Sequence, residues 1–434
     1  MISPQRRNEL VDALRRGTVP QRSLDVLAVG LERFESAIDD ELGRVRAGGA
    51  SFKAIRGEYG SGKTFFLRWL QERAKRLGFV TSEVQVSETE TPLHRLETVY
   101  RRLIERLSTS DMASGAFRST VDLWFLTLES DLEAEGNSED LENRLDALME
   151  KRLAAVSRQS PLFATTLRAY RRALHAADKE TAEALLAWLG GQPNVAAQAK
   201  RTAGVKGDID HFGALSFLQG LLAVVRDSGQ AGIVLVLDEV ETLQRVRSDA
   251  RDKSLNALRQ LVDEVDSGRF PGLYVAITGT PAFFDGPQGM QRLPPLSQRL
   301  HADFSGEARF DNPRAPQVRL TGFDQKALAS LGRKVRDIYV EGRPARERIL
   351  RAADDAYIAD LVQAVTGQLG GKVGVAPRVF LRKLIGDVLD RIDQFEDFDP
   401  RQHYKLTLRT EELTRVEAAA VGRLSPDDID LDLG

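Results

Sequence analysis

A glycine-rich stretch at residues 57–64 carries the most specific chemistry in the sequence. It reads G-E-Y-G-S-G-K-T, a complete G-x-x-x-x-G-K-[ST] phosphate loop. The glycines let backbone N–H groups turn toward an anion, and the following helix adds its positive end. We expect Lys63 to reach the β- and γ-phosphates of a nucleotide and Thr64 to bind Mg²⁺. The residues expected to bind ATP are Gly57, Glu58, Tyr59, Gly60, Ser61, Gly62, Lys63, Thr64 and Phe65.

An apolar run that ends in two acids, G-I-V-L-V-L-D-E at residues 232–239, supplies the second half of such a site. Its composition is that of a parallel strand buried on both faces. Asp238 would bind the magnesium ion, and Glu239 would polarise a water for in-line attack on the γ-phosphate. The alternative is a buried strand whose acids cap the next helix. Because both half-sites occur in one chain, we favour ATP hydrolysis.

Two threonines, Thr278 and Thr280, stand at the end of a further apolar run at residues 272–281. A hydroxyl at the end of a strand beside the phosphate loop can hydrogen-bond the γ-phosphate or the attacking water. Either threonine can equally be an ordinary turn residue, and the sequence does not distinguish between the two.

These residues converge only if a parallel sheet brings the carboxyl ends of its strands together. The apolar runs predict an α/β fold with a five-stranded parallel sheet, its strands near 52–56, 79–86, 232–238, 273–278 and 317–320. The helical pattern at about 108–207 is far longer than a plain crossover and is interpreted as an insertion. The expected parts are an N-terminal helical segment (1–50), a P-loop ATPase domain (51–323), a C-terminal helical lid domain (324–424) and an acidic, disordered tail (425–434).

Three stretches leave their roles open. The helix predicted over residues 31–45 either packs beside the adenine or simply covers the edge of the sheet. In the insertion, Tyr170 stands among arginines and could stack a base, but the interspersed charges of both signs favour a solvated helix face. A surface for a partner protein is the third possibility, which the sequence does not separate from these two. Residues 403–408 could form a short strand.

The composition is that of a globular protein with a sizeable core. The chain has 434 residues, 42% of them hydrophobic, and a net charge of −3. It contains no cysteine, which excludes disulfides and thiol catalysis, and its five histidines show no metal-binding spacing. The lack of a long apolar run predicts a cytoplasmic protein without a membrane span. The overall charge does not recommend nucleic acid as a partner, although a local basic patch remains open.

The order of these elements resembles that of AAA+ ATPases of the initiator-like kind. A closer resemblance is to the BrxD family, the ATP-binding proteins of bacterial BREX phage-defence systems. It is carried by A-L-R-R-G-T-V-P at 13–20, by F-K-A-I-R-G-E-Y-G-S-G-K-T-F-F-L at 52–67 and by G-T-P-A-F-F at 279–284.

This resemblance implies roles for two arginines. Arg378, in the context G-x-x-P-R, would be the lid arginine that contacts the γ-phosphate in its own subunit. Arg299 would be an arginine finger for the site of a neighbouring subunit, so that a homo-oligomer is expected. The asparagine that is familiar at the hydroxyl-tipped strand is missing.

Two functions follow from the resemblance. The first is an ATP-hydrolysing switch or loader that assembles other defence proteins on DNA. The second is a nucleotide-sensing scaffold with negligible turnover. Direct reading of a DNA sequence is not expected, because residues 393–434 are too short and too acidic for a recognition domain.

Overall fold

One parallel sheet forms the centre of the fold. The computed structural model describes residues 2–134, 141–369, 376–408, 413 and 418. The strands are β1 (Ser51–Arg56), β2 (Val80–Gln85), β3 (Ile233–Asp238), β4 (Leu273–Gly279) and β5 (Gln317–Arg319). They lie in the order β2-β3-β4-β1-β5, and every pair is parallel. The α/β class and all five predicted strands are therefore confirmed.

The register of the strands brings their chemically active ends level with one another. Gln85 at the end of β2 lies opposite Asp238 of β3, and Arg56 at the end of β1 lies opposite Gly279 of β4. Because β4 lies between β1 and β3, Thr278 stands between the phosphate loop and the acidic strand end.

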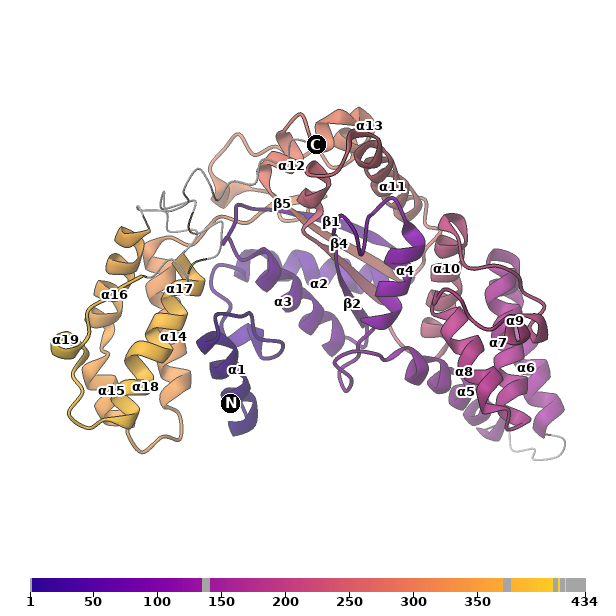
Figure 1. Cartoon of the computed structure of the whole chain (residues 1–434), viewed down its shortest axis with the longest axis horizontal. Coiled ribbons are helices and arrows are strands. Elements are labelled where there is room, and N and C mark those ends of the chain that lie inside the picture. The colour runs from indigo at the N-terminus through magenta and orange to yellow at the C-terminus, as the bar shows by residue number, and fades with distance from the viewer. Residues whose placement is uncertain (1, 135–140, 370–375, 409–412, 414–417, 419–434) are drawn as a thin grey trace.

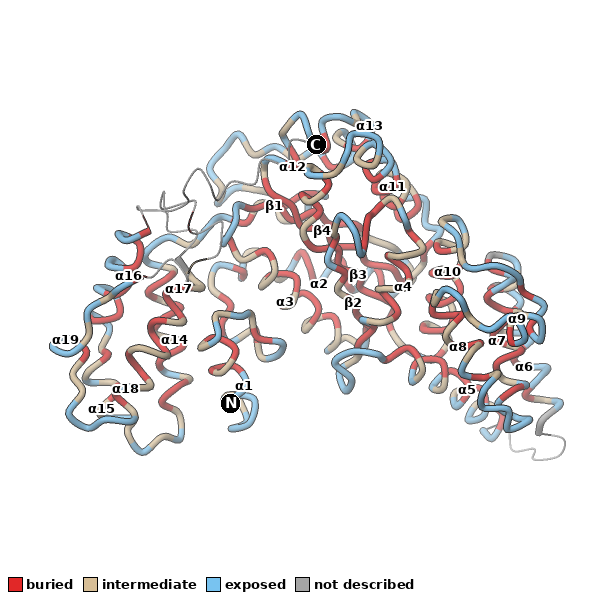
Figure 2. Tube along the Cα trace, in the orientation of Figure 1, coloured by how far each residue is buried: buried red, intermediate tan, exposed pale blue. Residues whose placement is uncertain are grey.

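Alternate side chains of each strand enter two different cores, because successive residues of a strand point to opposite faces. Val234 and Val236 of β3 pack with α2 and α3, whereas Leu235 and Leu237 pack with α4, α10 and α11. Both faces of the sheet are thus covered, and Figure 2 shows its strands buried. The covering helices are α2 (Glu32–Arg46), α3 (Lys63–Arg76), α4 (Leu96–Glu105), α10 (His211–Asp227) and α11 (Ser248–Asp266).

A block of helices separates β2 from β3 in the chain and packs against one edge of the sheet. Its core is continuous with the sheet: Phe217 of α10 contacts Phe163 and Trp188, with ring centroids 5.5 and 5.3 Å apart. The helices of the insertion are α5 (Phe117–Ala134), α6 (Leu141–Gln159), α7 (Pro161–His175), α8 (Lys179–Leu189) and α9 (Ala197–Thr202).

The position of Tyr170 excludes one of the alternatives for the insertion. Its side chain is fully buried, packs beside Phe125 and donates to Asp122, and burial raises the pKa of its hydroxyl to about 12. A base cannot stack on a ring inside the core, so the hypothesis of base stacking at Tyr170 is wrong. The neighbouring Arg168 and Arg171 form ion pairs on the helix surface, as a solvated face would.

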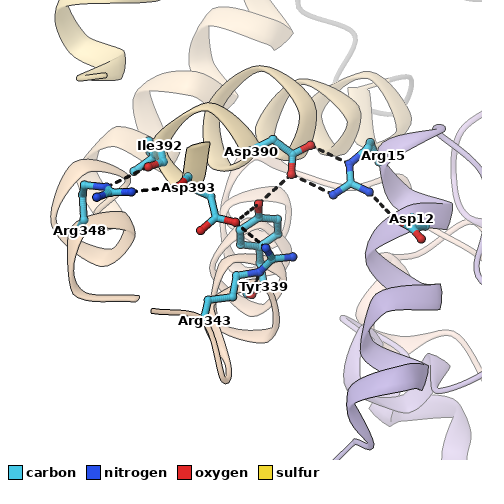
Figure 3. A network of polar contacts seen from close by, with 8 residues as sticks. All are labelled: Asp12, Arg15, Tyr339, Arg343, Arg348, Asp390, Ile392 and Asp393. Atoms are coloured by element: carbon cyan, nitrogen blue, oxygen red, sulfur yellow. Dashed lines mark hydrogen bonds and ion pairs between the residues drawn. The ribbon is translucent and has the colours of Figure 1, made fainter. Parts of the chain in front are cut away.

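The C-terminal helices form a second body that includes the N-terminal helix α1 (Pro4–Arg15). Leu10 and Leu14 of α1 are buried in the core of these helices. Arg15 donates from Nε and Nη2 to both carboxylate oxygens of Asp390, at 2.7 and 2.9 Å (Figure 3). The helices are α14 (Gln325–Val340), α15 (Arg346–Ala352), α16 (Asp355–Gln368), α17 (Ala376–Arg382), a π-helical stretch (Lys383–Leu389), α18 (Asp390–Gln394) and α19 (Pro400–His403).

The three parts form an arch, with the C-terminal helices at one end, the insertion at the other and the sheet between them (Figure 1). Two short helices, α12 (Pro281–Asp285) and α13 (Pro294–Arg299), lie over the sheet at the top of the arch. The expected strand at 403–408 is wrong: α19 ends at His403, and residues 404–408 form no strand. The tail at 425–434 lies outside the described residues.

Candidate nucleotide-binding site

The phosphate loop connects β1 to α3, which is the context that the motif requires. Gly60 and Gly62 have φ angles of 79° and 90°, in the left-handed region that favours glycine. Lys63 is buried, and its Nζ donates to the carbonyl oxygens of Gly57 at 2.9 Å and Glu58 at 3.3 Å. The ammonium group therefore lies inside the loop, where phosphate oxygens could take the place of these carbonyl oxygens as its hydrogen-bond acceptors.

Asp238 is the residue on which the site converges. Its Oδ2 accepts a hydrogen bond from the Thr64 hydroxyl at 3.1 Å. Its Oδ1 accepts from the Thr278 hydroxyl and from the backbone N–H of Glu239, the latter at 3.0 Å. Sequence reasoning left Thr278 and Thr280 as equals, and the structure brings Thr278 to the acidic strand end.

These oxygens fit a magnesium ion that arrives with a nucleotide. Mg²⁺ is usually bound by one or two carboxylates together with substrate phosphates and waters. The Thr64 hydroxyl and the Asp238 carboxylate, 3.1 Å apart beside the phosphate loop, are such a donor pair. In the described residues no group of three or more His, Cys, Asp or Glu side chains could hold a metal ion alone.

Glu239 has an unusual backbone conformation for a residue with a side chain. Its φ and ψ are 61° and 44°, in the left-handed region. Residues other than glycine with this conformation cluster at functional sites. Its backbone N–H also lies 3.1 Å from the Thr278 hydroxyl oxygen. Its Oε2 accepts from the Gln85 amide at 2.8 Å. Sequence reasoning missed Gln85, because only the pairing of β2 with β3 places it beside Glu239.

Two other predicted residues lie away from this cluster. Thr280 is buried at the start of α12, and its carbonyl accepts from the N–H groups of Phe283 and Phe284. Arg299 forms an ion pair with Asp263 and donates to the carbonyl of Pro295 at 2.8 Å. Neither residue lines the cavity that contains the phosphate loop.

A cavity of about 520 Å³ extends from the phosphate loop to the C-terminal helices. At one end it is polar, with Lys63, Thr64 and Glu239 in its wall. At the other end it is apolar, so that the two ends match the phosphates and the base of a nucleotide. The apolar wall contains Val19, Pro20, Leu27, Val29, Leu31, Phe34, Phe323, Leu331 and Leu381.

The residues of the phosphate loop take two positions relative to this cavity. Tyr59, Gly60, Ser61, Gly62, Lys63, Thr64 and Phe65 line it. Gly57 and Glu58 do not, and they contribute the carbonyl oxygens that hold Lys63.

Arg378 of α17 also lines the cavity. It lies far from the phosphate loop in the sequence but shares the same cavity. Its side chain packs against Gly17, where an added Cβ atom would lie 3.2 Å from Arg378 Cγ. Gly17 itself lines the cavity just after α1. The C-terminal helices and the N-terminal segment therefore enclose the site together.

Glu241 is a second residue that sequence reasoning missed. It is 5% exposed, lines the cavity, and neither of its carboxylate oxygens has a hydrogen-bond partner. Burial raises the pKa of this carboxyl group, while Lys63, whose Nζ lies 3.9 Å away, opposes the rise. Burial likewise lowers the pKa of Lys63, against the attraction of Glu241 and Asp238. Lys63 thus faces the buried carboxylate of Glu241 as well as the carbonyl oxygens of Gly57 and Glu58.

The parallel sheet, the phosphate loop and the hydroxyl–carboxylate pair are consistent with a P-loop NTPase. The chain belongs to the family of BREX system ATP-binding proteins BrxC/D, whose family model matches residues 2–408. Membership associates the chain with ATP binding and with phage defence, alongside other proteins of the BREX system.

No curated protein matches the sequence. Within the described residues, no helix combines the length and apolar character needed to cross a bilayer.

Proposed function

We propose that the chain hydrolyses ATP with Mg²⁺ as an AAA+-like switch. The observation that carries this is the convergence of Thr64, Asp238 and Glu239 beside the loop lysine. Thr64 and Asp238 would bind the metal, Lys63 the β- and γ-phosphates, and Glu239 would polarise the attacking water. Thr278 is a positioning residue in this scheme, because its hydroxyl holds both Asp238 and the Glu239 backbone.

The switch would operate through the C-terminal helices. Arg378 and the apolar residues of these helices share one cavity with the phosphate loop. A nucleotide in this cavity would contact both bodies, and the loss of its γ-phosphate would remove the anchor of Arg378. The cycle would open and close the arch and thereby load or assemble other BREX proteins, with DNA as their substrate.

The test is ATP turnover by the purified full chain. Glu239→Gln should bind ATP as the parent does and lose at least about a hundredfold in turnover, because a general base contributes about 10² to 10⁴. Lys63→Ala should lose ATP binding and serves as the blank. Nucleotide binding is measured by fluorescence titration and turnover by phosphate release. Unchanged turnover in Glu239→Gln would exclude Glu239 from the chemistry.

A nucleotide-sensing scaffold with negligible turnover is the second candidate. It is favoured by the hydrogen bond from Gln85 to the Glu239 carboxylate, which draws that side chain toward β2, and by the ion pair that occupies Arg299. If parent and Lys63→Ala release phosphate at the same rate although only the parent binds ATP, the scaffold is the correct function.

A further inference from the structure

A second cavity, of about 930 Å³, lies on the outer side of the edge strand β2. Its walls come from the start of α1, the connection at residues 21–26, the outer face of α3, the end of β2 and the connection from α4 to α5. Figure 1 places α1 and the start of α5 on the concave side of the arch, on either side of α3 and β2. No described residue lines both this cavity and the nucleotide cavity.

The acidic residues of this second cavity are all engaged. Seven basic and four acidic side chains line it, which leaves an excess of three positive charges. Each acid has at least one donor within the protein on one of its carboxylate oxygens. The partners are Arg76 for Asp25, the backbone N–H groups of Ser23 and Leu24 for Glu72, Gln71 for Glu83, and Arg102 for Glu90.

Four of the cations, by contrast, are unpaired within the described part of the chain. The side chains of Arg6, Arg22, Lys75 and Arg106 form no hydrogen bond or ion pair with the residues that the structure describes. Burial and the nearby Arg22 lower the pKa of Lys75, while the carboxylates of Glu72 and Glu83 act against this shift without forming an ion pair with the lysine. Unpaired cations that line a concave surface concentrate a positive field, which attracts an anion.

The uncharged lining indicates the chemical class of that anion. Serine and threonine hydroxyls dominate it, among them Thr89, Thr109 and Ser114, and such groups donate readily to phosphate oxygens. Of the described residues in the wall, none is aromatic, and the base-stacking platform of single-strand binding proteins is therefore missing. The four unpaired cations come from separate segments around a wide cavity, which suits an extended chain of phosphates better than one phosphate.

We propose that this cavity binds the phosphodiester backbone of a nucleic-acid duplex without reading its bases. The whole chain has a net negative charge, but the lining of this cavity has an excess of positive charge. Binding to phosphates requires only this local excess. The cavity also reaches Gln85, the residue whose amide holds Glu239, so that a bound duplex lies next to the nucleotide site. This inference goes beyond the proposed function and requires no ATP turnover.

The test is fluorescence anisotropy of a labelled duplex of roughly 20 base pairs with the full chain, in the absence of nucleotide. The double variant Arg22→Glu/Arg106→Glu should weaken binding at least tenfold. Because two phosphate contacts are lost, the slope of log affinity against log salt should fall by about 2. Arg201→Glu/Arg314→Glu changes the net charge equally at exposed sites outside the cavity and should bind within about twofold of the parent.

ATP binding by each variant shows that it is folded. If Arg22→Glu/Arg106→Glu is not folded, Arg22→Gln/Arg106→Gln takes its place. Labelled DNA and RNA duplexes identify which backbone is preferred, and preference for either supports the proposal. Three results would overturn it: no duplex binding by the parent, equal losses in the two double variants, or tighter binding of single strands. Equal displacement of the duplex by polyglutamate would also overturn it and point to an acidic protein instead.

Discussion

At the scale of the residue, two neighbouring strands and the start of a helix hold the acidic end of β3. Thr278 of β4 and Gln85 of β2 approach it from opposite sides, and Thr64 reaches it from the first turn of α3. Each contact engages a different atom: the two oxygens of Asp238 and the carboxylate of Glu239. The order of the strands therefore sets the directions from which Asp238 and Glu239 are held.

Gln85→Ala is expected to raise the rate of ATP hydrolysis. Since β2 lies on the far side of β3 from β1, the amide of Gln85 draws the Glu239 carboxylate away from the phosphate loop. Loss of a hydrogen bond of about 1 to 1.5 kcal/mol should increase kcat roughly five- to tenfold, with little change in KM. Gln71→Ala, which removes a bond to Glu83 elsewhere on β2, is the matched control. A lower kcat in Gln85→Ala would contradict this argument.

Glu241→Gln is expected to tighten ATP binding about five- to tenfold, the effect of about 1 to 1.4 kcal/mol. The buried carboxylate attracts Lys63 and repels phosphates that enter the same cavity. Glu58→Gln, which removes an exposed charge from the loop, should change the affinity little. Fluorescence titration measures all three proteins.

The difference between Glu241→Gln and the parent should shrink as the pH falls. Burial raises the pKa of the Glu241 carboxyl, so it takes up a proton at a higher pH than an exposed glutamate does. The protonated parent then resembles the variant, and the difference between their ATP affinities becomes smaller as the pH is lowered. An affinity ratio that is constant between pH 8 and pH 5 would exclude the carboxylate charge as its cause.

At the scale of the element, α1 connects the C-terminal helices to the nucleotide cavity. Its apolar face is part of their core, and Arg15 and Tyr339 both donate to Asp390, Tyr339 at 2.7 Å (Figure 3). The segment that follows α1 lines the nucleotide cavity at Gly17, against Arg378. A helix that lies far from the sheet is thus in a position to transmit movement of the C-terminal helices to the site.

Arg15→Ala is expected to lower both stability and ATP affinity. The Arg15–Asp390 pair is partly exposed, so its loss should reduce the free energy of unfolding by about 1 kcal/mol. ATP affinity should fall two- to fivefold, because the segment at Gly17 loses its anchor. Arg168→Ala breaks a comparable ion pair with Glu150 in the insertion and should leave ATP affinity unchanged. Thermal unfolding and ATP titration separate the two effects, and equal affinities in both variants would contradict the coupling.

At the scale of the whole molecule, one residue with a proposed role in hydrolysis lies outside the nucleotide cavity. Arg299 is 37% exposed on the sheet part of the arch, paired with Asp263 rather than with the phosphate loop. An arginine in this position has a role in hydrolysis only if a second copy of the chain presents its site to it. The oligomeric state and the rate of hydrolysis are therefore coupled in the proposed function.

Turnover per chain is expected to rise with protein concentration and to fall about 10³-fold in Arg299→Ala, the loss typical of an arginine finger. Mixing Arg299→Ala with Glu239→Gln should restore part of the activity, because the second variant supplies the arginine to intact sites of the first. Arg292→Ala breaks a neighbouring pair with Asp252 and is the control. Turnover that is independent of concentration, with no gain on mixing, would assign Arg299 a structural role only.

Much of the fold was readable from the chain because its signals are local. The apolar runs that form β1 to β5 and the helical spacing of the insertion depend on neighbours in sequence, and the structure agrees with both. Tyr170 shows where such reading is insufficient: an aromatic residue among arginines looks accessible, but its face of α7 is packed into the core. The stretch at 403–408 shows the same limit, since a short alternating segment forms a strand only if a sheet edge is free to accept it.

The sequence by itself determined the phosphate loop and the acidic end of β3, because each is a contiguous motif whose chemistry depends on backbone spacing. Only the tertiary structure decided that Thr278 rather than Thr280 reaches Asp238 and that Gln85 holds Glu239. It also decided that Glu241 is buried beside Lys63. These choices depend on strand order and on burial. Both arise from packing between segments that are distant in the chain, so no local pattern can specify them.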